Sequence, residues 1–233
     1  MNQKKAIFWD LDETMGDFEA LKTNGHDPVD EDTKAAKRYG IEKVLESLSS
    51  RGYNHFVTSF SPPDYVKRVV ELSGLAPYFS AVFGGGETYF RDSKGYAAAA
   101  KHAGLFNGEA AHSLIVVGDS PNDKPCDLEG VVFIHQPRGY AYDAAVVQEI
   151  VTALDALGKG SFIRGFEAMH SQAKEIPLRG GKYASNRRIF SLSGGLELEL
   201  SYNSNGCPDA EDKKHPIIFV GPAPQYEREP VQF

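Results

Sequence analysis

Cysteine is scarce in this chain. Only Cys126 and Cys207 occur among its 233 residues, and neither belongs to a Cys-x-x-Cys or cysteine–histidine spacing. Zinc sites and disulfide frameworks need several such residues at short, regular intervals. We therefore expect neither a zinc site nor a disulfide framework.

An excess of positive charge is also missing, and so is a long apolar run at the N-terminus. The formal net charge is −7, with 25 Lys and Arg against 32 Asp and Glu, so general binding of nucleic acid is not expected. The first apolar run, Ala6–Trp9, is too short for a signal peptide or a membrane span. We predict a cytoplasmic protein without a membrane partner.

Short apolar runs alternate with helical patterns over the first two thirds of the chain. The strand-like runs cover residues 6–9, 53–59, 79–85, 112–119 and 130–135. The helical patterns cover residues 31–51, 61–74, 94–103 and 141–157, with Ser61 as the expected N-cap of the second. Strands that are apolar on both faces and separated by helices indicate a parallel sheet covered on each side. We predict an α/β fold, a Rossmann-like three-layer sandwich.

The composition changes at the "GKG" that follows Leu157. Beyond it, residues 161–174 have a helical pattern, residues 187–202 read as a β-hairpin, and "IIFVG" (217–221) is a further strand. We predict a main domain over residues 1–158. Residues 159–233 then form a small α+β or β appendage.

Polar side chains stand where several of these strands end. Asp10 and Asp12 close the first strand, Thr58 closes the second, and Asp119 and Asp123 follow the fourth. Because ligands bind at the carboxyl ends of parallel strands, we expect these side chains to meet. Carboxylates held together repel one another unless a cation intervenes, and Mg²⁺ prefers oxygen ligands that include substrate phosphate. The pattern predicts a magnesium site that handles phosphate.

The same residues carry a resemblance to a known family. The order "DLDET", "VTS", a lysine and "GDSPND" resembles the haloacid dehalogenase (HAD) superfamily of aspartate-nucleophile phosphotransferases, over residues 5 to about 135. The resemblance implies the HAD fold, with residues 1–158 as the catalytic domain. It also implies a Mg²⁺-dependent phosphatase that hydrolyses a phosphate monoester through an aspartyl-phosphate.

The resemblance also assigns roles to the first two motifs. Asp10 matches the nucleophile. Asp12 matches the general acid and base, and its backbone carbonyl would be a metal ligand, while Thr14 supports the loop. Thr58 matches the hydroxyl that hydrogen-bonds the transferring phosphoryl group, with Ser59 as a weaker candidate.

The later motifs supply a cation and further metal ligands. Lys94 best matches the lysine that neutralises nucleophile and phosphate, and Lys101, two turns deeper in the helix, is the alternative. Asp119 and Asp123 match the metal-binding acids, with Asp119 the surer. The predicted metal ligands are thus Asp10, Asp12, Asp119 and Asp123.

Asp12 selects among the reactions of the family. Haloacid dehalogenases proper lack an acid there, because a halide leaves without a proton, and P-type ATPases have a threonine there together with membrane spans. Asp12 therefore favours hydrolysis of phosphate esters. The two places where family members insert a cap domain, residues 15–51 and 61–93, are too short for one, so the chain resembles the capless group.

Alternatives stay open for the substrate and for residues 159–233. The spelling "WDLDET" resembles the eyes-absent type of protein tyrosine phosphatase, which raises phosphotyrosine as a substrate. A non-catalytic HAD-fold scaffold that binds a partner through the appendage is the other alternative. The basic residues of the appendage fit a lid over an anionic substrate, but a packing module that forms a homo-oligomer is slightly favoured.

Overall fold

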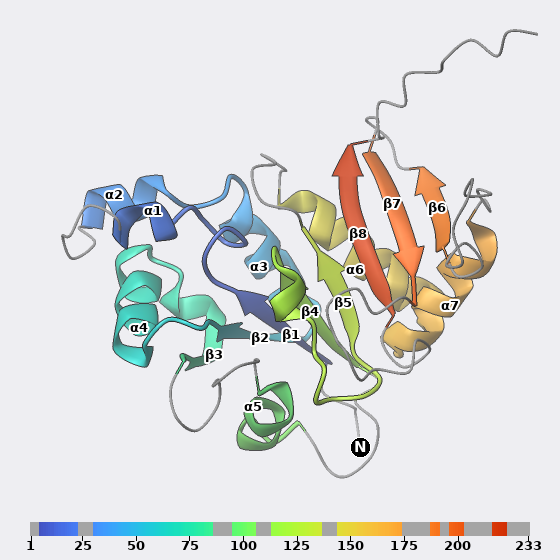
Figure 1. Cartoon of the computed structure of the whole chain (residues 1–233), viewed down its shortest axis with the longest axis horizontal. Helices are drawn as coiled ribbons and strands as arrows, with labels where there is room; N and C mark the ends of the chain where they lie inside the picture. The colour runs from blue at the N-terminus through green and yellow to red at the C-terminus, as the bar shows by residue number, and fades with distance from the viewer. Residues whose placement is uncertain are drawn as a thin grey trace, which may run out of the picture.

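The computed structural model describes residues 5–22, 30–85, 95–105, 113–136, 144–173, 187–191, 196–202 and 216–222. Within them, one sheet runs in the order β3-β2-β1-β4-β5-β8-β7-β6 (Figure 1). Its strands are β1 (Lys5–Asp10), β2 (Tyr53–Thr58), β3 (Phe79–Phe83), β4 (Leu114–Gly118), β5 (Val132–His135), β6 (Arg187–Ser191), β7 (Leu196–Ser201) and β8 (Ile217–Pro222). Strands β1–β5 and β8 are parallel, whereas β7 pairs antiparallel with β6 and β8.

Helices connect these strands. They are α1 (Glu19–Lys22), α2 (Asp30–Ala35), α3 (Ile41–Ser50), α4 (Pro63–Leu72), α5 (Tyr96–His102), α6 (Ala145–Gly158) and α7 (Phe162–Gln172), with the 3₁₀ turns η1 (Ala76–Tyr78) and η2 (Pro121–Asp123). The parallel sheet with helices on its faces confirms the predicted α/β fold class. None of the helices in the described segments is long and apolar enough to cross a membrane.

The alternation of side chains along β1 explains why the sheet is buried on both faces. Ile7 and Trp9 join a large apolar cluster with α3, α4, α6 and α7. Ala6 and Phe8 point the other way and join a second cluster with α5. All four side chains are buried, so β1 lies at the centre of the core and its carboxyl end is held firmly.

The strands beyond residue 159 continue this sheet. The predicted hairpin over residues 187–202 is confirmed as the antiparallel pair β6–β7. Strand β8 pairs with β5, and Leu198 and Leu200 of β7 join the same apolar cluster as α6 and α7. The division at residue 158 stays a prediction, but the described part of the C-terminal region contacts the main sheet directly.

Two local predictions are wrong. The helix expected over residues 31–51 is interrupted, because α2 ends at Ala35 and Gly40 adopts a left-handed φ of 80° before α3 begins. Ser61 is also not a helix cap, since Pro62 occupies the N-cap position of α4. The Ser61 hydroxyl instead contacts a residue of the candidate site, which sequence spacing alone could not show.

One observation on the cysteines adds to the expectation that the chain has no disulfide framework. Cys126, in the loop that leaves β4, takes part in a disulfide bond. The other cysteine of the chain, Cys207, lies outside the described residues.

Candidate active site

Strand β1 delivers Asp10 to the edge of the sheet at which β1, β2 and β4 end, called here the carboxyl edge. Asp10 pairs in register with Thr58 of β2, and its side chain is only 6% exposed. The loop after it turns back at once. Glu13 adopts a left-handed φ of 64°, and the amide of Met15 donates to the carbonyl of Leu11 at 3.0 Å. The turn allows the Thr14 hydroxyl to donate to Asp10 Oδ2 at 3.2 Å.

Strand β4 delivers two more acids to the same edge. Asp119 follows the strand directly, and Asp123 comes from η2. The amide of Ser120 donates to Asp123 Oδ2 at 2.9 Å, which orients that carboxylate. Gly118 is required here, because a β-carbon at this position would collide with the Asp123 side chain.

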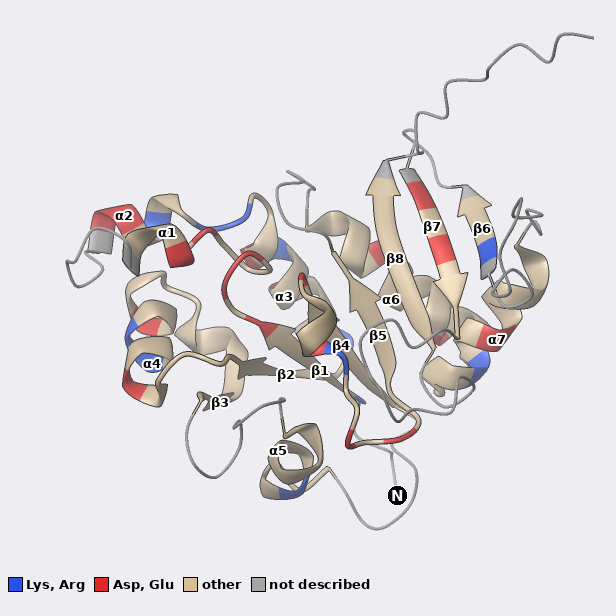
Figure 2. Ribbon diagram, viewed as in Figure 1, with Lys and Arg blue, Asp and Glu red and all other residues tan. Residues whose placement is uncertain are grey.

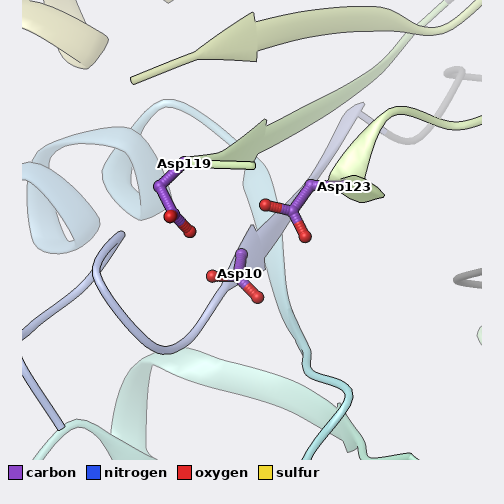
Figure 3. A group of neighbouring side chains, drawn as sticks. All are labelled: Asp10, Asp119 and Asp123. Carbon is purple, nitrogen blue, oxygen red and sulfur yellow. The ribbon is translucent and has the colours of Figure 1, made fainter. Parts of the chain in front are cut away.

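The carboxylates of Asp10, Asp119 and Asp123 converge on one point (Figure 3). Each offers an oxygen, the three oxygens lie within 4.8 Å of one another, and all three side chains are buried. Three buried negative charges at this separation repel strongly without a cation. An all-oxygen donor set suits a hard divalent cation such as Mg²⁺, so these residues fit the predicted metal.

Asp12 lies apart from this cluster. Leu11 points into the core between the two aspartates, and the Asp12 side chain is only partly buried. Its Oδ2 accepts a hydrogen bond from the Ser61 hydroxyl at 3.3 Å. Burial and the charges of Asp12 and Glu19 raise the pKa of Tyr65 at the start of α4. The hydroxyl of Tyr65 donates to the carbonyl of Phe18 at 3.1 Å.

The hydroxyls of the second motif are held by the backbone. Thr58 is fully buried, and its Oγ1 donates to the carbonyl of Trp9 at 3.3 Å. Ser59 is buried as well, and its Oγ accepts from the amide of Ser61 at 3.1 Å. Both residues stand at the carboxyl edge, next to Asp10 in the sheet. Their roles toward a phosphoryl group stay predictions.

The candidates for the lysine that neutralises nucleophile and phosphate are Lys94 and Lys101. Lys94 lies outside the described residues. Lys101 is exposed in the last turn of α5. Because α5 runs into β4, which ends at the carboxyl edge, the last turn of α5 lies toward the opposite edge of the sheet. The geometry therefore does not place Lys101 at the carboxylate cluster.

Two residues near the cluster were missed by sequence reasoning. Lys124 directly follows Asp123 and is only 2% exposed, an unusual burial for a lysine. At the end of β5, His135 Nε2 lies 2.8 Å from the carbonyl of Asp119. Burial lowers the pKa of His135, and the charges of Asp119 and Asp123 oppose that effect. In the sequence, the only sign of a role for Lys124 is its position directly after Asp123.

The parallel sheet and the acids at its carboxyl edge define an α/β protein with a metal-type carboxylate cluster. Residues 29–125 match the family model of haloacid dehalogenase-like hydrolases, a stretch that contains Thr58, Asp119 and Asp123. This match covers less than half of the chain, and it supports the family resemblance and the hydrolase activity predicted from the motifs.

Several solved structures match part of this chain. A HAD-superfamily hydrolase of subfamily IA from Geobacter sulfurreducens PCA shares 18% identity over 58% of this chain and 91% of its own, with a TM-score of 0.45. A HAD-superfamily hydrolase from Ehrlichia chaffeensis shares 15% over 65% and 98%, with a TM-score of 0.47. A predicted phosphoglycolate phosphatase from Haemophilus somnus 129PT shares 18% over 60% and 88%, with a TM-score of 0.45. A comparison with curated proteins gave no match.

Proposed function

We propose that this hydrolase is a Mg²⁺-dependent phosphatase that cleaves a phosphate monoester through an aspartyl-phosphate on Asp10. The observation that carries the proposal is the convergence of the Asp10, Asp119 and Asp123 carboxylates at the end of buried strands. In this proposal the cluster puts the nucleophile, Asp10, beside the residues that would hold the cation. Phosphoryl transfer needs this combination of positioning and charge neutralisation from a protein.

The first half of the reaction uses Asp10 as nucleophile and Asp12 as acid. A carboxylate oxygen of Asp10 attacks phosphorus, a new O–P bond forms, and the bond from phosphorus to the ester oxygen breaks. Asp12 donates a proton to the departing alkoxide, which leaves as an alcohol. The hydrogen bond from Thr14 holds Asp10 in place during the attack. Mg²⁺, held by Asp10, Asp119, Asp123 and the carbonyl of Asp12, would neutralise charge on the phosphoryl oxygens.

The second half regenerates the enzyme. Asp12, now a carboxylate, accepts a proton from water as that water attacks phosphorus. The bond from Asp10 to phosphorus breaks, and inorganic phosphate and the free Asp10 carboxylate result. Asp12 is the acid that fits this double role, because it is partly exposed and stands outside the buried cluster. Thr58 and Lys94 are proposed to contact the phosphoryl group, with Ser59 as a weaker donor.

Hydrolysis of p-nitrophenyl phosphate tests the proposal. We expect turnover that requires Mg²⁺ and disappears with EDTA, and Asp10→Asn should abolish it because the nucleophile is gone. Asp64→Asn is the matched control, since Asp64 is an exposed aspartate on α4. Beryllium fluoride should bind the wild-type chain with Mg²⁺ and should not bind Asp10→Asn. Equal turnover in Asp10→Asn, or none that depends on Mg²⁺, would contradict the proposal.

A further inference from the structure

A cavity lined by basic side chains lies toward the same edge of the sheet as the carboxylate cluster. A cavity of about 520 Å³ opens between the segment that leads into α3 and the start of α6. Four cationic side chains line it: Lys34, Lys37, Arg38 and Lys43. Glu42 is the one carboxylate among its described lining residues, and it accepts a hydrogen bond from Lys37 at 2.8 Å. Figure 2 shows the Lys and Arg residues of the segment that joins α2 to α3 in blue.

The positive potential of this cavity is reinforced by the backbone. The first turns of two helices line it, since Ile41–Val44 begin α3 and Ala145 and Gln148 belong to the first turn of α6. Their N-caps are Gly40 and Ala144, whose side chains have no group that could accept a hydrogen bond. Helix N-termini carry partial positive charge and amide donors that suit anions. The chain as a whole has a net charge of −7, so the positive charge gathered at this cavity favours a negatively charged ligand there.

The cavity lies toward the carboxyl edge of the sheet, where the carboxylate cluster also lies. Helix α3 runs into β2 and α6 follows β5, so the first turn of each helix lies toward the carboxyl edge. Arg38, which lines the cavity, also forms hydrogen bonds to the loop that carries Asp12. The guanidinium of Arg38 donates to the carbonyl of Glu13 at 2.5 Å, and the amide of Arg38 donates to the carbonyl of Met15 at 2.8 Å.

A further hydrogen bond joins the two walls of the cavity. The amide of Ala144, the N-cap of α6, donates to the carbonyl of Tyr39 at 3.3 Å. The side chain of Tyr39 is itself 80% exposed and lines the cavity, so it offers an aromatic face beside the cations. The site therefore combines charge, amide donors and an apolar surface, which suits a small organic anion more than a bare ion.

We propose that this cavity binds an anionic group, phosphate or carboxylate, of a small molecule. The ligand is either the remote end of the substrate or a separate effector, and both sources share this chemistry. The first source rests on the proposed phosphatase function. The binding itself does not, so a titration without catalysis can test it independently.

The binding experiment follows amide NMR resonances of the wild-type chain during titration with inorganic pyrophosphate in Mg²⁺-free buffer. We expect shifts at Glu42 and Lys43, in the first turn of α3, and weakening by added salt. The double variant Lys34→Gln/Lys43→Gln should weaken affinity about tenfold, the usual effect of losing charged hydrogen bonds. Lys67→Gln/Arg68→Gln is the matched control, since both residues are exposed on α4. A thermal melt of each variant verifies folding.

Kinetics with two substrates separate the two sources. If the cavity holds the remote end of the substrate, Lys34→Gln/Lys43→Gln should raise KM for a sugar bisphosphate at least about fivefold more than KM for p-nitrophenyl phosphate. If the cavity holds an effector, the double variant should change the two KM values alike and should still bind pyrophosphate more weakly than the wild type. A double variant that binds pyrophosphate like the wild type, or shifts confined to the surroundings of Asp10 and Asp119, would overturn the proposal. A chain without phosphatase activity would refute the proposed function. The pyrophosphate titration would still test whether the cavity binds an anion.

Discussion

The hydroxyl of Ser61 donates to Asp12 Oδ2 at 3.3 Å across 49 positions of sequence. This contact joins the loop after β1 to the segment that leads into α4. It orients the side chain of Asp12, the proposed acid and base, which lies apart from the carboxylate cluster. A residue that sequence patterns would place in a helix cap thus becomes part of the site.

Replacement of Ser61 tests this contact. We expect Ser61→Ala to lower kcat for p-nitrophenyl phosphate about tenfold, because a hydrogen bond to a charged group contributes on the order of 1.5 kcal/mol. Ser61→Thr, which keeps the hydroxyl, should retain most of the activity. Ser50→Ala removes an exposed hydroxyl on α3 and is the control. A Ser61→Ala enzyme with wild-type kcat would show that Asp12 needs no such support.

The buried carboxylates predict opposite effects of one substitution with and without metal. Asp119→Asn removes one of three like charges, so the metal-free protein should become more stable by about 1 kcal/mol. The wild-type chain should gain about 2.7 kcal/mol at a Mg²⁺ concentration 100 times its Kd, and the variant should lose most of that gain. Chemical denaturation with EDTA and with Mg²⁺ measures both. A variant that is less stable without metal would argue against charge repulsion in the cluster.

Lys124 makes a further prediction about charge. A buried ammonium needs a compensating anion, and within the described residues the buried acids are Asp10, Asp119 and Asp123. Lys124→Met should destabilise the metal-free protein by about 1–3 kcal/mol. It should also lower the Mg²⁺ concentration that half-saturates stabilisation, because a competing cation is gone. Lys67→Met, on exposed α4 surface, is the control. Weaker Mg²⁺ binding in Lys124→Met would contradict this role.

His55 predicts how stability depends on pH. It is fully buried, and its Nδ1 accepts a hydrogen bond from Trp9 Nε1 at 3.0 Å, which an imidazolium could not do. Burial lowers the pKa of His55 from 6.5 to about 4. The unfolded chain therefore binds the proton first, and stability contributed by neutral His55 is complete above pH 6.5 and is lost as the pH falls toward 4.

The variant His55→Gln keeps an acceptor for Trp9 and removes the titration. Between pH 6.5 and 4, its free energy of unfolding should fall less than that of the wild type, by a difference on the order of 3 kcal/mol. Denaturant unfolding across this pH range measures it. Parallel curves for the two proteins would show that His55 does not titrate differently on folding.

Much of the fold could be predicted from patterns that act locally. The strands around Phe8, Val57, Val116 and Phe133 read as apolar runs because a parallel sheet buries both faces. The break before α3 could not be read this way. The helical pattern of residues 31–51 continues across Gly40, and a single left-handed residue there redirects the chain.

The amino-acid sequence by itself determined which segments of the chain form strands and which acids stand at their ends, because strand periodicity and the Asp-x-Asp and Gly-Asp spacings are properties of short segments. Only the tertiary structure decided that Asp10, Asp119 and Asp123 share one point while Asp12 stays outside it. It alone brought the first turns of α3 and α6 to one basic cavity. Such contacts depend on strand order and helix packing, which join residues that no local pattern connects.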